Sequence, residues 1–259
     1  MKGRVSELFK SAGAIVCLEF RLARKEPLPV LMGAAMALIF SYFLRPVFHA
    51  DSNLAGGDRM VAGFAIMFAF FMVSTVAASF FNDHNWGTWE RARLAGAGMP
   101  AVILGKTIVP FVSFCFQMVL IFGFSRFLFH SENRWSVGLI SLFCAILASY
   151  LVFLGIFLTF LCGSLVQVSS VSSLLAPVLA CLGGALFPVH LLPWWIQQLA
   201  PISPTFWVMK GLTCGVSGGC DAESILSALG FSMAHVLLIA GFALGAFRLG
   251  FRPIPRMRI

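Results

Sequence analysis

The sequence predicts an all-α membrane protein with six transmembrane helices. Of its 259 residues, 59% are hydrophobic and only 11% are charged, whereas soluble proteins average about a quarter charged. A helix that crosses ~30 Å of hydrocarbon needs ~20 apolar residues. Five runs without Asp, Glu, Lys or Arg suit such helices, at 27–44, 60–82, 107–125, 135–209 and 224–247. Lipid is therefore the expected surrounding of most of the chain.

Residues 1–26 precede the first span and are expected to form an interfacial amphipathic helix. Apolar residues recur at helical spacing, as at Val5, Leu8, Phe9 and Ala12, with Lys and Arg elsewhere around the helix. The alternative is a frayed basic tail that only sets the topology. The segment is too charged to contain the apolar region of a cleavable signal peptide, so we expect the first span to direct insertion.

The remaining residues, 27–259, are predicted to form one membrane domain. The run 135–209 is too long for one helix, and we expect it to break between Gly163 and Ser173 and again from Pro188. The prolines that follow make the next stretch too irregular to cross the membrane. The six spans are therefore expected near 27–48, 60–82, 104–129, 136–162, 171–188 and 224–247.

The distribution of positive charge predicts the orientation of these spans. Of the 18 Lys and Arg residues, 13 fall in segments on the inner side, and only Arg45, Arg59, Arg126, Arg134 and Lys210 fall in segments on the outer side. Basic loops stay cytoplasmic, so both termini are expected in the cytoplasm of a bacterium, with the protein in its inner membrane. The formal net charge of +8 is then explained by topology and lipid headgroups, and no nucleic-acid partner is expected.

Cysteine and histidine give no sign of a metal site or of catalysis. The seven Cys form no C-x-x-C pair, and the five His form no pair four residues apart. Cys214 and Cys220 fall in the outer segment, where a disulfide and two free thiols both fit. His235, in the middle of the last span, would contact substrate or a proton, or form a hydrogen bond between helices, which we favour.

The inner loop near 84–98 contains the most distinctive local pattern. A turn-rich start is followed by a short helical stretch with two Trp, one Glu and two Arg, which is suited to docking a cytoplasmic partner. A connector lying among lipid headgroups is the alternative. The nearby Gly105-Lys106-Thr107 is not a nucleotide-binding loop, because Pro100 stands where the first glycine would be. We therefore expect no enzymatic activity in this chain.

Two motifs resemble those of type-2 ABC transporter permeases. The sequence GTWER at 87–91, followed by Pro100 and LGK at 104–106, resembles the first family pattern. The sequence GG at 183–184, with FP at 187–188, LPWW at 192–195 and Pro204, resembles the second. The family pattern implies that 189–210 is an outer re-entrant segment. An insertion, AGAG at 95–98, departs from the commonest form of the first pattern.

The resemblance implies half of an ATP-driven exporter. Two permease chains, expected to be a homodimer, would assemble with two cytoplasmic ATPase subunits, which would bind the ATP and magnesium. Residues near 84–98 would form the coupling helix that contacts the ATPase, with 1–26 as the connecting helix beside it. The ATPase-coupling residues implied are Gly87, Thr88, Trp89, Glu90, Arg91 and Arg93. Glu90 would anchor the junction, with Arg91, Arg93, Arg21 or Arg24 as its partner.

The resemblance also implies a substrate path between the second and fifth spans of the two protomers. Its expected residues are Phe68, Phe71, Met72 and Thr75 on the second span and Leu175, Leu179 and Leu182 on the fifth. A lipid-facing surface is the alternative for each. Aromatic and Met side chains suit a hydrophobic or amphiphilic cargo, such as a drug or antibiotic. Export of a lipid-linked glycan, and a scaffold that binds an ATPase but moves nothing, are the alternative functions.

Overall fold

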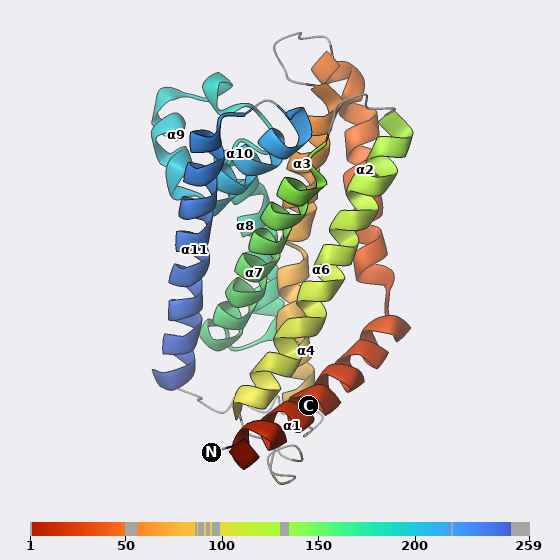
Figure 1. The fold of residues 1–259 in the computed structure, drawn as a ribbon, viewed down its shortest axis with the longest axis vertical. Coiled ribbons are helices and arrows are strands. Elements are labelled where there is room, and N and C mark those ends of the chain that lie inside the picture. The colour runs from red at the N-terminus through yellow and green to blue at the C-terminus, as the bar shows by residue number, and fades with distance from the viewer. Residues whose placement is uncertain are drawn as a thin grey trace.

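Long helices run side by side through most of the molecule (Figure 1). This computed structural model describes residues 2–49, 56–85, 87, 91, 94, 99–129, 135–218 and 220–249, and all regular elements among them are helices. The N-terminal elements are α1 (Lys2–Lys25), α2 (Leu28–His49), α3 (Gly56–Ala69), α4 (Met72–Asn85) and α6 (Met99–Phe129). The others are α7 (Val137–Leu161), α8 (Leu165–Leu182), η1 (Val189–Leu191), α9 (Trp194–Leu199), η2 (Ala200–Ile202), α10 (Pro204–Ser217) and α11 (Ala222–Leu249).

Six stretches of helix among the described residues are long and apolar enough to cross a membrane. They are Leu28–Pro46, Arg59–Asp83, Leu104–Leu128, Val137–Leu161, Leu165–Leu182 and Ala222–Ala246. The second is 78% buried within the chain, whereas the first, fifth and sixth are only 17%, 22% and 22% buried. The second span thus forms the centre of the bundle, and the apolar faces of the outer helices remain open to lipid or to other chains.

The second span is not one continuous helix. Between α3 and α4, the amides of Phe70 and Phe71 donate to the carbonyls of Met67 and Phe68, three residues back, in place of the usual four. Phe70 is fully buried, but Phe71 is 45% exposed. The two adjacent aromatic rings thus face different sides of the bundle at this interruption, which the apolar run at 60–82 did not indicate.

The fifth span begins earlier than the sequence suggested, at Leu165 in place of residue 171. The serines expected to break the chain are accommodated within the helix. Ser164 caps its start by accepting a hydrogen bond from the amide of Gln167, while Ser172 and Ser173 donate to carbonyls four residues back. The helix ends at Leu182, before Gly183 and Gly184, and Gly184 has a φ of +70° that suits glycine.

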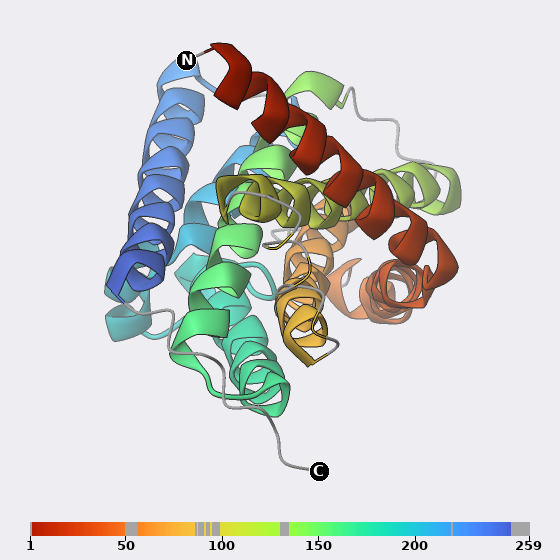
Figure 2. The ribbon, with the colours of Figure 1, turned by 90° about the horizontal axis from the view of Figure 1, so that it is seen from below.

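The two ends of the bundle differ in construction. At one end α1 crosses beneath α6, as seen from below in Figure 2. At the other end η1, α9, η2 and α10 form a group of short helices between α8 and α11, and α10 packs against α3, α7, α8 and α11. The stretch 189–210 is therefore more helical than its prolines suggested. A re-entrant path into a membrane stays a prediction for this segment, as does a membrane-surface position for α1.

Candidate functional site

Lys106 joins three helices at the α1 end of the bundle. Its Nζ lies 2.7 Å from Glu19 Oε1 on α1 and 2.8 Å from Asp83 Oδ2 on α4. It also donates a 2.7 Å hydrogen bond to the backbone carbonyl of Ser79. The Lys106 side chain is fully buried, and a buried ammonium group is tolerated only when it is paired and hydrogen-bonded. This cluster therefore fixes α1, α4 and α6 relative to one another.

The neighbouring glycine lets α1 approach closely. A Cβ atom on Gly105 would lie 2.6 Å from Cγ2 of Ile15, closer than carbon atoms pack. The absence of a side chain at Gly105 thus allows α1 to pack closely against α6, and the ion pair of Lys106 with Glu19 stabilises this packing. In the sequence, Gly105 and Lys106 were interpreted as a false nucleotide-binding loop and as part of a family pattern, and Lys106 also as one of the inner-side basic residues that set the topology. The missed signal was a Lys beside a long apolar run, which has to find carboxylate partners near the membrane.

The predicted coupling residues are only partly within the described chain. Gly87 has a φ of +64°, and its carbonyl accepts a 3.3 Å hydrogen bond from the amide of Arg91, whose side chain is exposed. Thr88, Trp89, Glu90 and Arg93 lie outside the described residues. Their assignment to the ATPase contact therefore stays a prediction.

The arginines expected to pair with Glu90 lie on α1. Arg21 is exposed, and the guanidinium carbon of Arg24 lies 4.7 Å from the ring centre of Phe20. The acid of α1 that joins it to the bundle is Glu19, which was not predicted. The link between the connecting helix and the membrane domain is thus made by an acid on α1 and a lysine on α6.

The predicted substrate-path residues of the second span gather on the side of α2 and α6. The Phe68 ring lies 5.6 Å from the ring of Phe40 on α2 and stacks on Phe71 at 5.9 Å. Met72 and Thr75 line a cavity that α1, α2 and α6 also border.

The fifth-span residues of the predicted path lie on α8. Leu175 and Leu179 are half-buried there and pack against the main apolar core. That core also contains Phe68 and Met72 of the second span, and α8 packs directly against α3 and α4. A path through the second and fifth spans stays a prediction.

The second family-like motif forms a tight junction with α3. A Cβ atom on Gly63 would lie 1.8 Å from the backbone oxygen of Ala185, so only glycine fits there. One turn earlier, Arg59 Nη2 donates a 3.0 Å hydrogen bond to the carbonyl of Gly184. The hydroxyl of Thr205 donates to the carbonyl of Leu179, which also accepts a hydrogen bond from the amide of Gly183 at the end of α8. Residues 183–185 are thus fixed between α3 and α10.

Aromatic and polar contacts tie the outer segment to α11. The Trp207 and Phe231 rings stack at 4.2 Å. The Nε2 atom of His235 lies 3.1 Å from the carbonyl oxygen of Ile202, so this histidine makes the inter-helix contact that we favoured from the sequence.

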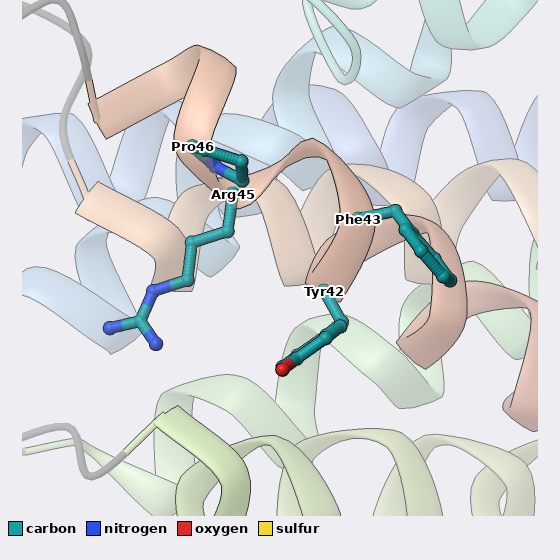
Figure 3. Close-up of a pocket in the computed structure, with 4 residues that line it drawn as sticks. All are labelled: Tyr42, Phe43, Arg45 and Pro46. Atoms are coloured by element: carbon teal, nitrogen blue, oxygen red, sulfur yellow. The ribbon is translucent and has the colours of Figure 1, made fainter.

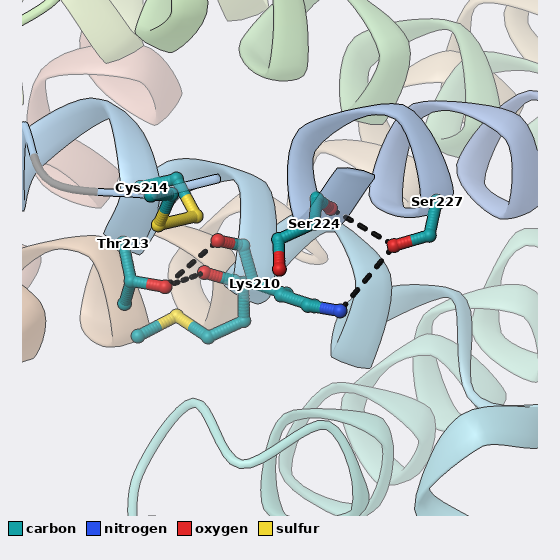
Figure 4. The surroundings of a disulfide bond; sticks show 7 residues. Lys210, Thr213, Cys214, Ser224 and Ser227 are labelled. Carbon is teal, nitrogen blue, oxygen red and sulfur yellow. Dashed lines mark hydrogen bonds between the residues drawn. A yellow bond between two sulfur atoms is a disulfide. The ribbon is translucent and has the colours of Figure 1, made fainter. Parts of the chain in front are cut away.

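A disulfide joins the end of α10 to the approach of α11 (Figure 4). It links Cys214 and Cys220, a pairing that the sequence left open. One turn below it, Lys210 Nζ donates a 3.3 Å hydrogen bond to the hydroxyl of Ser227. Together these contacts hold α10 against α11.

Two further hollows lie at the end of the bundle opposite α1. One is lined by Tyr42, Phe43, Arg45 and Pro46, all from the end of α2, and Figure 3 shows their side chains projecting from that single helix. The other, of about 230 Å³, lies under the outer segment and is bordered by Arg59, His190 and Lys210. Among the described residues, only α2 lines the hollow at Tyr42. The hollow at Arg59 has basic side chains in its lining.

The comparisons with known proteins agree with this architecture. The sequence profile described as ABC-2 type transporter matches residues 11–215. The match includes Lys106 and its two carboxylates, both family-like motifs and five of the six apolar spans. The comparison with curated proteins found no match. Because the family match extends over most of a chain with six apolar spans, this multi-pass membrane protein belongs to the ABC-2 type transporter family as a permease component, distinct from the nucleotide-binding domain.

Proposed function

We propose that this chain is the permease subunit of an ATP-driven exporter that moves a hydrophobic or amphiphilic compound out of a bacterial cell. In this proposal both termini and α1 are cytoplasmic, and the outer segment faces the periplasm. Two ATPase subunits, which bind ATP and magnesium, dock on the loop near 84–98 of two permease chains. The motor is thus on other chains, as is general for permeases of this family.

The observation that carries the proposal is the Lys106 cluster. Asp83 belongs to α4, directly before the predicted coupling segment, while Glu19 belongs to α1 and Lys106 to α6. A displacement of the coupling segment by the ATPase would reach α4 first, and the cluster would transmit it to α1 and α6 as one unit. Such rigid coupling is what a permease needs to convert motion at its cytoplasmic end into rearrangement of its spans.

The surface of α1 supports a position at the membrane interface. Leu18, Phe20 and Leu22 are 50%, 40% and 44% exposed, on a helix that also carries Arg21 and Arg24. Apolar side chains beside basic ones suit the boundary between acyl chains and anionic headgroups. The helix would then move with the membrane surface while Glu19 fixes it to the bundle.

The function is tested by reconstitution. The chain is co-expressed with an ABC ATPase subunit of the same organism, purified in lipid and placed in proteoliposomes with a fluorescent amphiphile. We expect ATP-dependent movement of the amphiphile, and Glu90→Ala should lower cargo-stimulated ATP hydrolysis about tenfold, because one lost charge contact of ~1.4 kcal/mol gives that factor. Glu223→Ala, an exposed acid in the first turn of α11, is the matched control and should behave as wild type.

Distinct results would contradict distinct parts of the proposal. Failure of any ATPase to copurify, or wild-type rates for Glu90→Ala, would remove the assigned coupling role. An ATPase that binds and hydrolyses ATP without moving any cargo would indicate the scaffold alternative. Movement of a lipid-linked glycan with no movement of small amphiphiles would identify the glycan alternative.

A further inference from the structure

A cavity of about 200 Å³ lies between α1, α2, α4 and α6, next to the Lys106 cluster. Glu19 and Glu26 border it from α1 and the link to α2, and Asp83 borders it from α4. Its described lining residues include three carboxylates and neither Lys nor Arg. Arg21 and Arg24 of the same helix are exposed and do not border it.

The charges at this cavity do not balance. The one ammonium group at its edge, that of Lys106, contacts both Glu19 and Asp83 and is fully buried. The Glu19 and Asp83 side chains keep 15% and 23% of their surface accessible, and Glu26 has no part in the ion pairs of this cluster. The cavity therefore presents excess negative charge, and a cation entering it would be attracted more strongly than in bulk water.

The deeper wall of the cavity is apolar with a few hydroxyl groups. Val30 of α2 and Met72 of α4 border it together with Thr75, Ser79 and Ser113. An apolar pocket with a few polar groups that fix orientation is typical of a small-molecule site. The lining thus suits a ligand with a positive head and an apolar body.

An unpaired amide lies on α6, beyond the residues that line this cavity. Gln117 is one helical turn beyond Ser113 on α6, and its amide lies against Gly33, just beyond Val30 on α2. The side chain is fully buried, and neither its nitrogen nor its oxygen has a hydrogen-bond partner in the described structure. A buried amide without partners costs free energy unless another state or a ligand satisfies it.

We propose that this cavity is the cytoplasmic entry site of the cargo and that it selects cationic amphiphiles. The inference rests on the proposed function and narrows its substrate class. Glu26, Glu19 and Asp83 hold a positively charged amine or guanidinium head, while the apolar body begins at the wall formed by Val30 and Met72. At about 200 Å³ the cavity takes only such a head, since whole drug-sized ligands occupy ~300–1,000 Å³. A polyanionic, diphosphate-linked glycan would be repelled there.

The test compares three probes with one apolar body. The full chain is placed in neutral phosphatidylcholine nanodiscs, and binding is measured by fluorescence for dansyl alkyl chains ending in trimethylammonium, hydroxyl or sulfonate. We expect the trimethylammonium probe to bind at least about fivefold more tightly than the other two. Glu26→Gln should weaken only that probe, by about fivefold, and added salt should reduce the difference.

The test variant and one control variant show whether the result is specific to the cavity. Glu26 is exposed at the end of α1 and outside the Lys106 cluster, so its amide variant is expected to fold. Glu223→Gln, at the opposite end of the chain's membrane domain, should leave all three affinities unchanged. Equal binding of the three probes, or wild-type affinity in Glu26→Gln, would overturn the entry site. Because binding is measured without nucleotide or ATPase, this failure is distinguishable from a failure of transport.

Discussion

Replacing Lys106 with Met is expected to destabilise the membrane domain and to loosen α1. Met is unbranched and nearly as long as Lys, so it keeps an apolar stem at this position but removes the ammonium group. Glu19 and Asp83 then face each other across the former site without a cation between them. The carbonyl of Ser79 also loses the hydrogen bond that Lys106 donates.

The size of the effect follows from the geometry of the cluster. Removing one partner of a buried ion pair costs ~3–5 kcal/mol. Because the Glu19 and Asp83 side chains are 15% and 23% exposed, water can solvate them in part, which lowers the expected loss to ~2–3 kcal/mol. At ~2–4 °C per kcal/mol for a chain of this size, the melting temperature should fall by ~5–10 °C.

Thermal unfolding of the purified chain in nanodiscs measures this change. Lys210→Met, which removes a lysine bonded to a single serine hydroxyl, is the matched control and should cost less than ~1 kcal/mol. A triple variant that combines Lys106→Met with Glu19→Gln and Asp83→Asn should recover more than half of the loss, because no charge is then stranded. A melting temperature unchanged in Lys106→Met, or no recovery in the triple variant, would refute the assigned role of the cluster.

Two further changes test the outer end. Gly63→Ala should lower the unfolding free energy by ~3 kcal/mol or more, because the added Cβ would overlap the Ala185 backbone. Gly241→Ala is the control: a Cβ there would meet nothing within 4 Å, so this change should be neutral or stabilising. Equal melting temperatures of the two variants would contradict the close approach of Gly63 to Ala185. Replacing both Cys214 and Cys220 with Ser should lower the unfolding free energy by about 2 kcal/mol, since the disulfide closes a short loop of sequence separation 6. A reductant should lower the melting temperature of the wild type to that of the variant. A wild-type melting temperature that does not respond to reductant would argue against the disulfide.

The helical class and the six spans were predictable because they depend on local composition. A stretch of about 20 residues without charged side chains suits the lipid interior, so four of the six spans were indicated by runs of their own, and the fourth and fifth shared the run 135–209. The expected break between the fourth and fifth spans is present at 162–164, but its expected extension to Ser173 was wrong. The hydroxyls of Ser172 and Ser173 donate hydrogen bonds to carbonyls of the same helix, so these serines remain helical. Composition alone does not show whether a serine will do this.

The candidate site was less predictable because its residues are distant in sequence. Glu19 and Lys106 are separated by 87 residues, and Asp83 belongs to a third helix. Each residue alone also fits a different interpretation, as a charge that sets topology or marks a loop. Only the crossing of α1 under α6 brings them together, and that crossing depends on Gly105 meeting Ile15. The proposed entry cavity could not be predicted from the sequence for the same reason, since residues of four separate helices border it.

The junction between Arg59 and Gly184 has a consequence for how the protein is made. Arg59 is synthesised 125 residues before the carbonyl that it contacts, and Gly63 equally long before Ala185. During synthesis the second span must therefore enter the membrane with its guanidinium held by water or lipid headgroups. The packing of α3 against residues 183–185 can form only after these residues and the fifth span have emerged from the ribosome. The packing of the most buried span of the finished protein is thus completed only after residues 183–185 have been made.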